Sequence, residues 1–175
     1  MIVALVGCSL AAMGQKVTQG SLDFMRDVKS MSVVFVFDQA TVPDNGNISI
    51  TEFGGMRDAK DNEKPGSFMY EIKNEAYEMS HEFVRRASSK MKDVRFIWKE
   101  GEPYTMTCVL RTVGTRGQHC NSDYIFTNTA TGEVLAIVNC ECRGGTLGTF
   151  TNLMKDSYND AFGKVIGKMA KAHKK

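Results

Sequence analysis

YTMTCVLRTVGTRGQHCNSDYIFTNTATGEVLAIVNCEC, residues 104–142, decides the fold class of this chain. The stretch contains three runs rich in β-branched and aromatic residues, at 104–113, 122–128 and 133–142. The turn-forming sequences GTRGQ and TATG separate these runs. A shorter run, VRFIWKE (94–100), precedes them across the turn GEP. Alternating side chains and short turns predict four strands joined as a meander of antiparallel hairpins.

The flanking sequence predicts one more strand and two helices. MSVVFVFD (31–38) has no Pro or Gly and is typical of a strand buried on both faces. Apolar residues recur at spacings of three and four in 67–91 and again in 149–172. The predicted order is strand, helix, four strands, helix, and the first β-α-β unit should have a right-handed crossover. We therefore expect an α+β fold, with one antiparallel-rich mixed sheet and two helices packed on one face.

Residues 39–66 interrupt this pattern within a single predicted domain, 15–175. They contain the turn-forming pairs Pro43-Asp44, Asn45-Gly46 and Pro65-Gly66, so we expect a long mobile loop. Ser49 and Glu52 have the spacing of a capping box, which allows a short helical turn near 50–60.

The first 14 residues, MIVALVGCSLAAMG, carry no charge and predict a signal peptide with cleavage before Gln15. Ala12 and Gly14 are the small residues expected at such a site, although the usual positive charge near Met1 is missing. Two alternatives remain open. Leu5-Val6-Gly7-Cys8 is similar to a lipobox, in which Cys8 would be lipidated, and IVALV could instead be a buried strand. The first two interpretations predict an exported protein, placed in the periplasm, at the outer membrane or outside the cell.

Composition excludes several classes of function. The formal net charge of +2 is too small for a nucleic-acid partner. No apolar run reaches the roughly 18 residues that a membrane span requires. The three histidines are scattered and no G-x-S-x-G motif is present, so we do not expect an enzyme. RGGTLGT (143–149) lacks the P-loop and G-x-G-x-x-G patterns; it is more typical of a connector than of an anion site, and no cofactor is expected.

The cysteines form the one cluster with chemical potential. Cys8 lies in the predicted signal, whereas Cys108, Cys120, Cys140 and Cys142 belong to the mature chain. A hairpin that turns near Thr131 places Cys120 opposite Glu141 or Cys142. A disulfide between Cys120 and Cys142 suits an oxidising compartment, with Cys140 as the alternative partner. Free thiols, or a soft-metal or redox site that adds His119, also remain open.

Two details of the predicted helices bear on partner surfaces. His81 falls off the apolar stripe of the first helix, so we expect it to be solvated. Gly163 and Gly167 have G-x-x-x-G spacing, which suggests that another backbone approaches closely, from the sheet or from a partner.

Four segments carry a family resemblance: SMSVVFVFD (30–38), KDVRFIWKE (92–100), YTMTCVLRT (104–112) and NTATGEVLAIV (128–138). In this order, with a terminal amphipathic helix, the chain resembles small exported α/β proteins of the Gram-negative envelope. The amino-terminal domain of TolB and the curli-secretion lipoprotein are similar in shape, and short secreted proteins of Bacteroidales are similar along the whole mature chain. The resemblance implies an envelope location and a binding or assembly role, with another envelope protein as partner. It carries over no catalytic residues, and the four mature cysteines depart from its pattern.

Overall fold

The computed structural model describes residues 15–174 of the chain. The predicted signal peptide, with Cys8, lies outside this range, so its cleavage and its lipidation both stay predictions.

The elements follow the chain in this order: β1 (Lys16–Gly20), the 3-10 helix η1 (Leu22–Arg26), β2 (Ser30–Val36), β3 (Thr41–Val42), the 3-10 helix η2 (Pro43–Asn45), β4 (Ile48–Ser49), α1 (Ile50–Lys60), α2 (Ser67–Lys90), β5 (Arg95–Ile97), β6 (Tyr104–Val113), β7 (His119–Asn128), β8 (Val134–Arg143) and α3 (Phe150–His173). The described residues thus contain the predicted strand, helix, four strands and helix, together with elements that the sequence did not predict.

All strands belong to one mixed sheet, whose main order is β1-β8-β7-β6-β2-β5. The pairs β8–β7 and β7–β6 are antiparallel, as the predicted hairpins require, and the unpredicted β1 pairs antiparallel with β8. The predicted hairpin between 94–100 and 104–113 is wrong, because β2 lies between β5 and β6. β2 runs parallel to both of its neighbours, β6 and β5. The segment β2-α2-β5 is therefore a parallel β-α-β unit. The short β3 extends the line of β2 beside β6, and β4 pairs antiparallel with β3.

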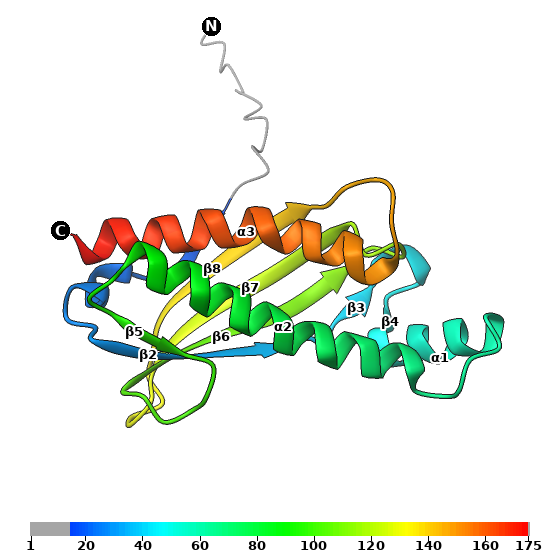
Figure 1. Cartoon of the computed structure of the whole chain (residues 1–175), viewed down its shortest axis with the longest axis horizontal. Helices are drawn as coiled ribbons and strands as arrows, with labels where there is room; N and C mark the ends of the chain where they lie inside the picture. The colour runs from blue at the N-terminus through cyan, green and yellow to red at the C-terminus, as the bar shows by residue number, and fades with distance from the viewer. Residues whose placement is uncertain (1–14, 175) are drawn as a thin grey trace, which may run out of the picture.

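Helices α2 and α3 lie side by side across one face of the sheet, and the core fills the space between the layers (Figure 1). Phe83 of α2 and Phe162 of α3 are fully buried, with ring centroids 5.2 Å apart. Phe35 of β2 joins them, 5.7 Å from the ring of Phe162. This arrangement confirms the predicted α+β class. Among the described residues, no helix is long and apolar enough to span a membrane.

The segment predicted as a long loop, 39–66, carries β3, η2, β4 and the third helix, α1, so that prediction is wrong. Ser49 caps α1 as its spacing to Glu52 suggested, because the Ser49 hydroxyl accepts a hydrogen bond from the amide of Glu52 at 3.1 Å. Ile50 is completely buried and fixes the start of α1 to the core. Gly54 in α1 allows close packing, because a Cβ at this position would lie 2.6 Å from the Phe68 ring of α2.

Smaller differences concern element ends. β1 was not predicted, because KVTQG holds one apolar residue among polar ones. β7 begins at His119, three residues before the predicted start at 122. Gly66, in the left-handed conformation, is the N-cap of α2, and Ser67 is the first residue of the helix, as the predicted range 67–91 has it.

Candidate functional site

The outer edge of β2 is covered at both ends and uncovered in the middle. β5 pairs with Ser30–Ser32 only, and β4 pairs with β3 at Thr41 and Val42. Between these pairings, no strand of the described chain lies beside residues 33–38 on the side away from β6. We call this uncovered edge, Val33 to Asp38, the strand gap.

A groove follows the strand gap. Its cavity measures about 440 Å³, with all six residues of the gap along one wall. The opposite wall is the side of α2 that carries Lys73, Ala76, Tyr77 and Ser80, and Trp98 closes the end next to β5. α2 has 24 residues, whereas the edge strand that it covers, β5, has three. Part of α2 therefore extends past β5, along a stretch where no edge strand lies against the helix.

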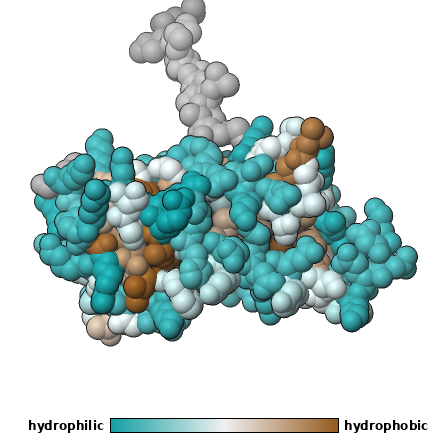
Figure 2. Space-filling view, in the orientation of Figure 1, coloured by the Kyte–Doolittle hydropathy of each residue, from teal (hydrophilic) through white to brown (hydrophobic). Residues whose placement is uncertain are grey.

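Apolar surface gathers in the same part of the molecule. Figure 2 shows brown surface among hydrophilic side chains where β5 and β2 emerge below α2. Most large apolar side chains are buried, but Tyr77 keeps 50% of its surface exposed and Trp98 keeps 39%. Exposed Trp and Tyr side chains beside a groove are typical of positions that dominate binding energy in protein interfaces.

Tyr77, His81 and Trp98 form an aromatic cluster at the α2 wall of the groove. The ring centroids of His81 lie 4.5 Å from Tyr77 and 4.7 Å from Trp98, and Tyr77 lies 5.5 Å from Trp98. The prediction of a solvated His81 is wrong, because its Nε2 is buried and finds no hydrogen-bond partner in residues 15–174. The cluster holds the exposed rings of Tyr77 and Trp98 in fixed positions.

The cysteines take the predicted register at the other end of the sheet. Cys120 on β7 lies directly opposite Cys142 on β8. All four described cysteines are buried free thiols. The Cys120 thiol donates a hydrogen bond to the Gly117 carbonyl at 3.5 Å, and the sulfur atoms of Cys140 and Cys142 lie 3.4 Å apart. The disulfide between Cys120 and Cys142 stays a prediction. Non-reducing peptide mapping of protein from its native compartment tests it, and four free thiols would exclude it.

The structure separates His119 from the thiols. Neighbouring residues of a strand point to opposite faces, and accordingly Cys120 is buried whereas His119 is exposed. The described residues contain no group of three or more His, Cys, Asp or Glu side chains placed to hold a metal ion. Burial raises the pKa of the Cys120 thiol to about 12, and the hydrogen bond to Cys140 raises the pKa of the Cys142 thiol. Cys120 and Cys142 therefore stay protonated and weakly nucleophilic, which does not favour a site built from several thiolates. The hydrogen bond from Cys142 lowers the pKa of Cys140, so the redox alternative stays a prediction.

The spacing of Gly163 and Gly167 does not bring the sheet close. Both positions lie on the exposed side of α3, and a Cβ built at either one would meet nothing within 4 Å.

Comparison with known proteins suggests no function for this chain. No protein-family model matches the chain, and no curated protein is similar to it. A solved structure described as that of an uncharacterized protein matches with a TM-score of 0.39 and 11% sequence identity, over 82% of this chain and 97% of the other. A likeness this distant carries no argument about function, so the proposals below rest on the geometry of this chain.

Proposed function

We propose that this protein is a non-enzymatic binding module of the cell envelope, and that it takes an extended segment of a partner protein into the strand gap. The observation that carries the proposal is the uncovered β2 edge at Val33–Asp38, with strands at both ends and a longer helix behind it.

An extended segment suits the gap because of the backbone. An edge strand presents N–H and C=O groups that have no partner on the open side, and an added strand pairs with them. Six residues of strand span about 20 Å at roughly 3.3 Å per residue. A segment of about this length would complete the outer row of the sheet between β5 and β4.

The walls of the groove define the side chains of the partner. Alternate residues of an added strand would face α2, where Ala76 and the Tyr77 ring offer an apolar surface. We expect apolar side chains at those positions and no proline in the middle of the segment, because proline cannot donate a backbone hydrogen bond. Lys73 and Asp38 place one charge of each sign in the wall.

Panning of random eight-residue peptides displayed on phage tests the proposal on the purified protein. Peptides that bind the parent should alternate apolar with other residues and should lose at least about tenfold in affinity on Tyr77→Ala or Trp98→Ala, as expected for interface anchors. Tyr70→Ala is the matched control: Tyr70 lies on the same helix and is 69% exposed, but it does not line the groove. Both tyrosines are exposed, so neither variant should unfold the protein.

Hydrogen exchange then locates the binding. Amides of Val33–Asp38 should exchange more slowly when a selected peptide is bound, whereas amides of β1, at the opposite edge, should not change. The proposal is wrong if no peptide is enriched, if enriched peptides bind Tyr77→Ala as tightly as the parent, or if protection appears elsewhere.

The envelope location rests on residues 1–14 and needs its own test. Mass spectrometry of the protein from its native cells should find Gln15, or a residue directly beside it, at the amino terminus. A lipid-modified Cys8 would replace cleavage by anchoring, and an intact Met1 in the cytoplasm would contradict export in either form.

A further inference from the structure

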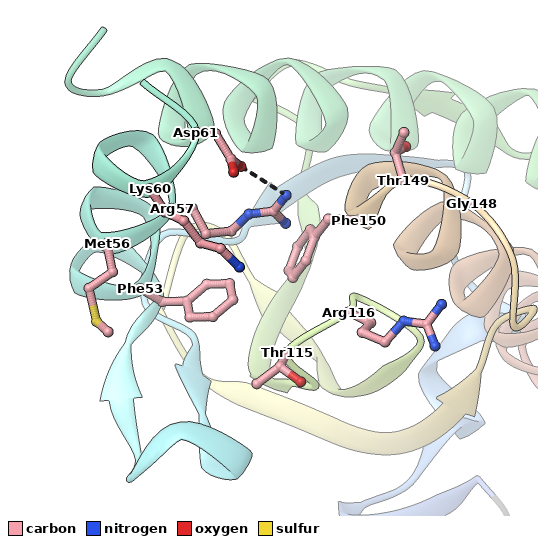
Figure 3. Close-up of a pocket in the computed structure, with 10 residues that line it drawn as sticks. All are labelled: Phe53, Met56, Arg57, Lys60, Asp61, Thr115, Arg116, Gly148, Thr149 and Phe150. Carbon is pink, nitrogen blue, oxygen red and sulfur yellow. Dashed lines mark ion pairs between the residues drawn. The ribbon is translucent and has the colours of Figure 1, made fainter. Parts of the chain in front are cut away.

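A second cavity, of about 490 Å³, lies where three separate segments meet, and it shares no lining residue with the strand gap. Its walls come from the second half of α1, from the turn between β6 and β7, and from the start of α3 (Figure 3). Segments this far apart in the sequence could not be assigned to one site before the fold was known.

The lining of this cavity is strongly basic. Arg57 and Lys60 of α1 reach toward the ring of Phe150 from one side, and Arg116 lies on the other side of that ring (Figure 3). Asp61 is the one carboxylate among the lining residues, and its oxygen lies 3.8 Å from the Arg57 guanidinium. Three cations against one anion leave two positive charges in excess.

Arg57 is partly neutralised by Asp61, and both guanidinium groups are also held in place by contacts with uncharged groups. The guanidinium carbon of Arg57 lies 5.3 Å from the centroid of the Phe68 ring and 5.7 Å from that of Phe150. Arg116 donates one hydrogen bond to the Thr146 carbonyl, at 2.8 Å. A guanidinium has five N–H donors, so most remain available to an incoming anion. Side chains that are already ordered lose less conformational entropy when a ligand binds.

We infer that this cavity binds a small phosphomonoester, with the phosphoryl group against Arg57 and Lys60. A phosphoryl group carries a charge of about −1.5 to −2 near neutral pH, which matches the excess charge of the walls, whereas a carboxylate carries only −1. Arginine pairs with phosphate oxygens through two parallel hydrogen bonds, and lysine supplies a point charge. Thr115 adds a hydroxyl to the lining.

The apolar residues of the cavity favour an ester over free phosphate. Met56 lines it and is 55% exposed, and the rings of Phe53 and Phe150 form the wall beside the cations. An organic group attached to the phosphoryl oxygen would cover part of the exposed surface of Met56, whose sulfur lies 4.0 Å from the side-chain nitrogen of Asn45. The start of α3 adds a weak positive potential, but Thr149 already caps it by accepting from the Asn152 amide, so the side-chain cations carry the site.

Calorimetric titration of the full chain with phenyl phosphate, inorganic phosphate and benzoate tests the inference. We expect phenyl phosphate to bind tightest and benzoate weakest. Lys60→Gln should weaken phenyl phosphate binding by about tenfold, since it removes a charge-assisted contact with the phosphoryl group, whereas Arg116→Gln, across the Phe150 ring, should weaken it less. Lys64→Gln is the matched control: it removes the same charge from an exposed position a few residues beyond Lys60 that lines no described cavity.

Other results of the titrations would each reject one part of the inference: the ester, the phosphoryl group or the site itself. Equal binding of phosphate and phenyl phosphate would reject the ester. Benzoate binding as tightly as phenyl phosphate would reject the phosphoryl group. Absence of binding at millimolar ligand, or equal weakening by Lys64→Gln and Lys60→Gln, would reject the site. Circular dichroism of each variant confirms that a lost affinity is not a lost fold.

Discussion

The two outer edges of the sheet are built in opposite ways. At one edge, β1 is short and exposed, begins with Lys16, and has an irregular register between Val17 and Gln19. At the other edge, the strand gap contains Val33, Val34, Phe35 and Val36, which pair with β6 in regular register, followed by Phe37, with no charge before Asp38. Charged residues, bulges and short strands are the devices by which proteins keep an edge from pairing with other chains.

The contrast between the two edges indicates that the uncovered edge of β2 has a use in binding. A chain that protects one edge with lysine and a bulge leaves six apolar-rich residues unprotected at the other. An unprotected apolar edge is an aggregation hazard unless something covers it. The comparison therefore supports a partner segment at β2, and each prediction below alters one of the two edges or the part of the core that joins them.

Removing the support beneath the open edge should have the largest effect. Phe162 is fully buried, and its ring packs against Phe35 of β2 and Phe83 of α2. Phe162→Ala should lower the free energy of unfolding by about 3–5 kcal/mol, because the cavity it leaves cannot collapse completely. Urea denaturation measures the loss. Leu147→Ala, at a side chain 89% exposed, should change it by less than about 0.5 kcal/mol. A Phe162→Ala protein as stable as the parent would mean that the helices do not pack on β2 as described.

A substitution at the protected edge should have the next largest effect. Gly20 ends β1 with φ +66°, and a Cβ there would lie 2.0 Å from the Leu135 carbonyl oxygen of β8. Gly20→Ala should destabilise by about 1–3 kcal/mol, the range for a strained backbone position. It should also loosen β1 and leave β8 as a second open edge, which light scattering would detect as self-association.

Gly46→Ala separates the two causes of the lost stability, which are the strain of a positive φ and the clash of the added Cβ with β8. Gly46 has a similar φ of +79°, but nothing lies within 4 Å of its Cβ position. It should therefore show the backbone cost alone, about 1–2 kcal/mol, without self-association. Equal effects of the two variants would contradict the close approach of Gly20 to β8.

Sequence reasoning reached the protected side of the sheet better than the open side. The turn at 129–132 fixed the β7–β8 pairing so closely that Cys120 was expected opposite Glu141 or Cys142, and it lies opposite Cys142. Hairpins are local, so a good turn and regular alternation determine their register. The sequence allowed only a short helical turn near 50–60 where α1 runs from Ile50 to Lys60, because a glycine such as Gly54 counts against a helix until the Phe68 ring that it accommodates is known.

The strand gap could not be predicted, because it depends on where two short strands stop. β5 ends at Ile97 and β4 has two residues. The capping residue Ser49 marks the end of β4, but no proline or glycine follows Ile97 before Gly101. Tyr77 and Trp98 also looked unrelated, since 20 positions of chain separate them. The basic cavity was hidden for the same reason: Arg57, Lys60 and Arg116 meet only through packing of α1 against the rest of the fold.

Giving the open edge a charge of its own should change binding more than stability. Ala76→Lys places an ammonium on the α2 wall of the groove. Lysine and alanine have similar helix propensities, so the free energy of unfolding should change by less than about 1 kcal/mol. Peptides selected on the parent protein should bind the variant at least about tenfold more weakly, because a buried unpaired charge opposes docking. Asn74→Lys, at an exposed position of the same helix outside the groove, should bind them normally. Normal binding to Ala76→Lys would place the docking surface elsewhere.

The smallest expected effect is a pH dependence at His173, which joins the segments next to the two edges. Its Nδ1 lies 2.7 Å from the carbonyl of Met25, in the 3-10 helix after β1, and its Nε2 lies 2.8 Å from the carboxylate of Asp93, just before β5. Both partners are acceptors, so both ring nitrogens must donate, which only the imidazolium can do. These hydrogen bonds, the one to Met25 first, raise the pKa of His173, whereas its partial burial and, less strongly, the charge of Lys29 oppose the shift.

Because the pKa of His173 is higher in the folded state than in the unfolded state, the stability that it contributes falls as pH rises. The stabilisation from His173 is fully present below the unfolded pKa of about 6.5, and it is lost as pH rises through the higher folded value. The pKa of Asp93 is lowered by the same hydrogen bond, so its contribution is lost only on acidification, as pH falls through the lowered value. Urea unfolding of the parent between pH 6 and 9 should therefore show stability falling with pH, and His173→Gln should remove that slope. His119→Gln, at an exposed histidine, should keep it. If the slope survives His173→Gln, the end of α3 does not tie the two edges together through an imidazolium.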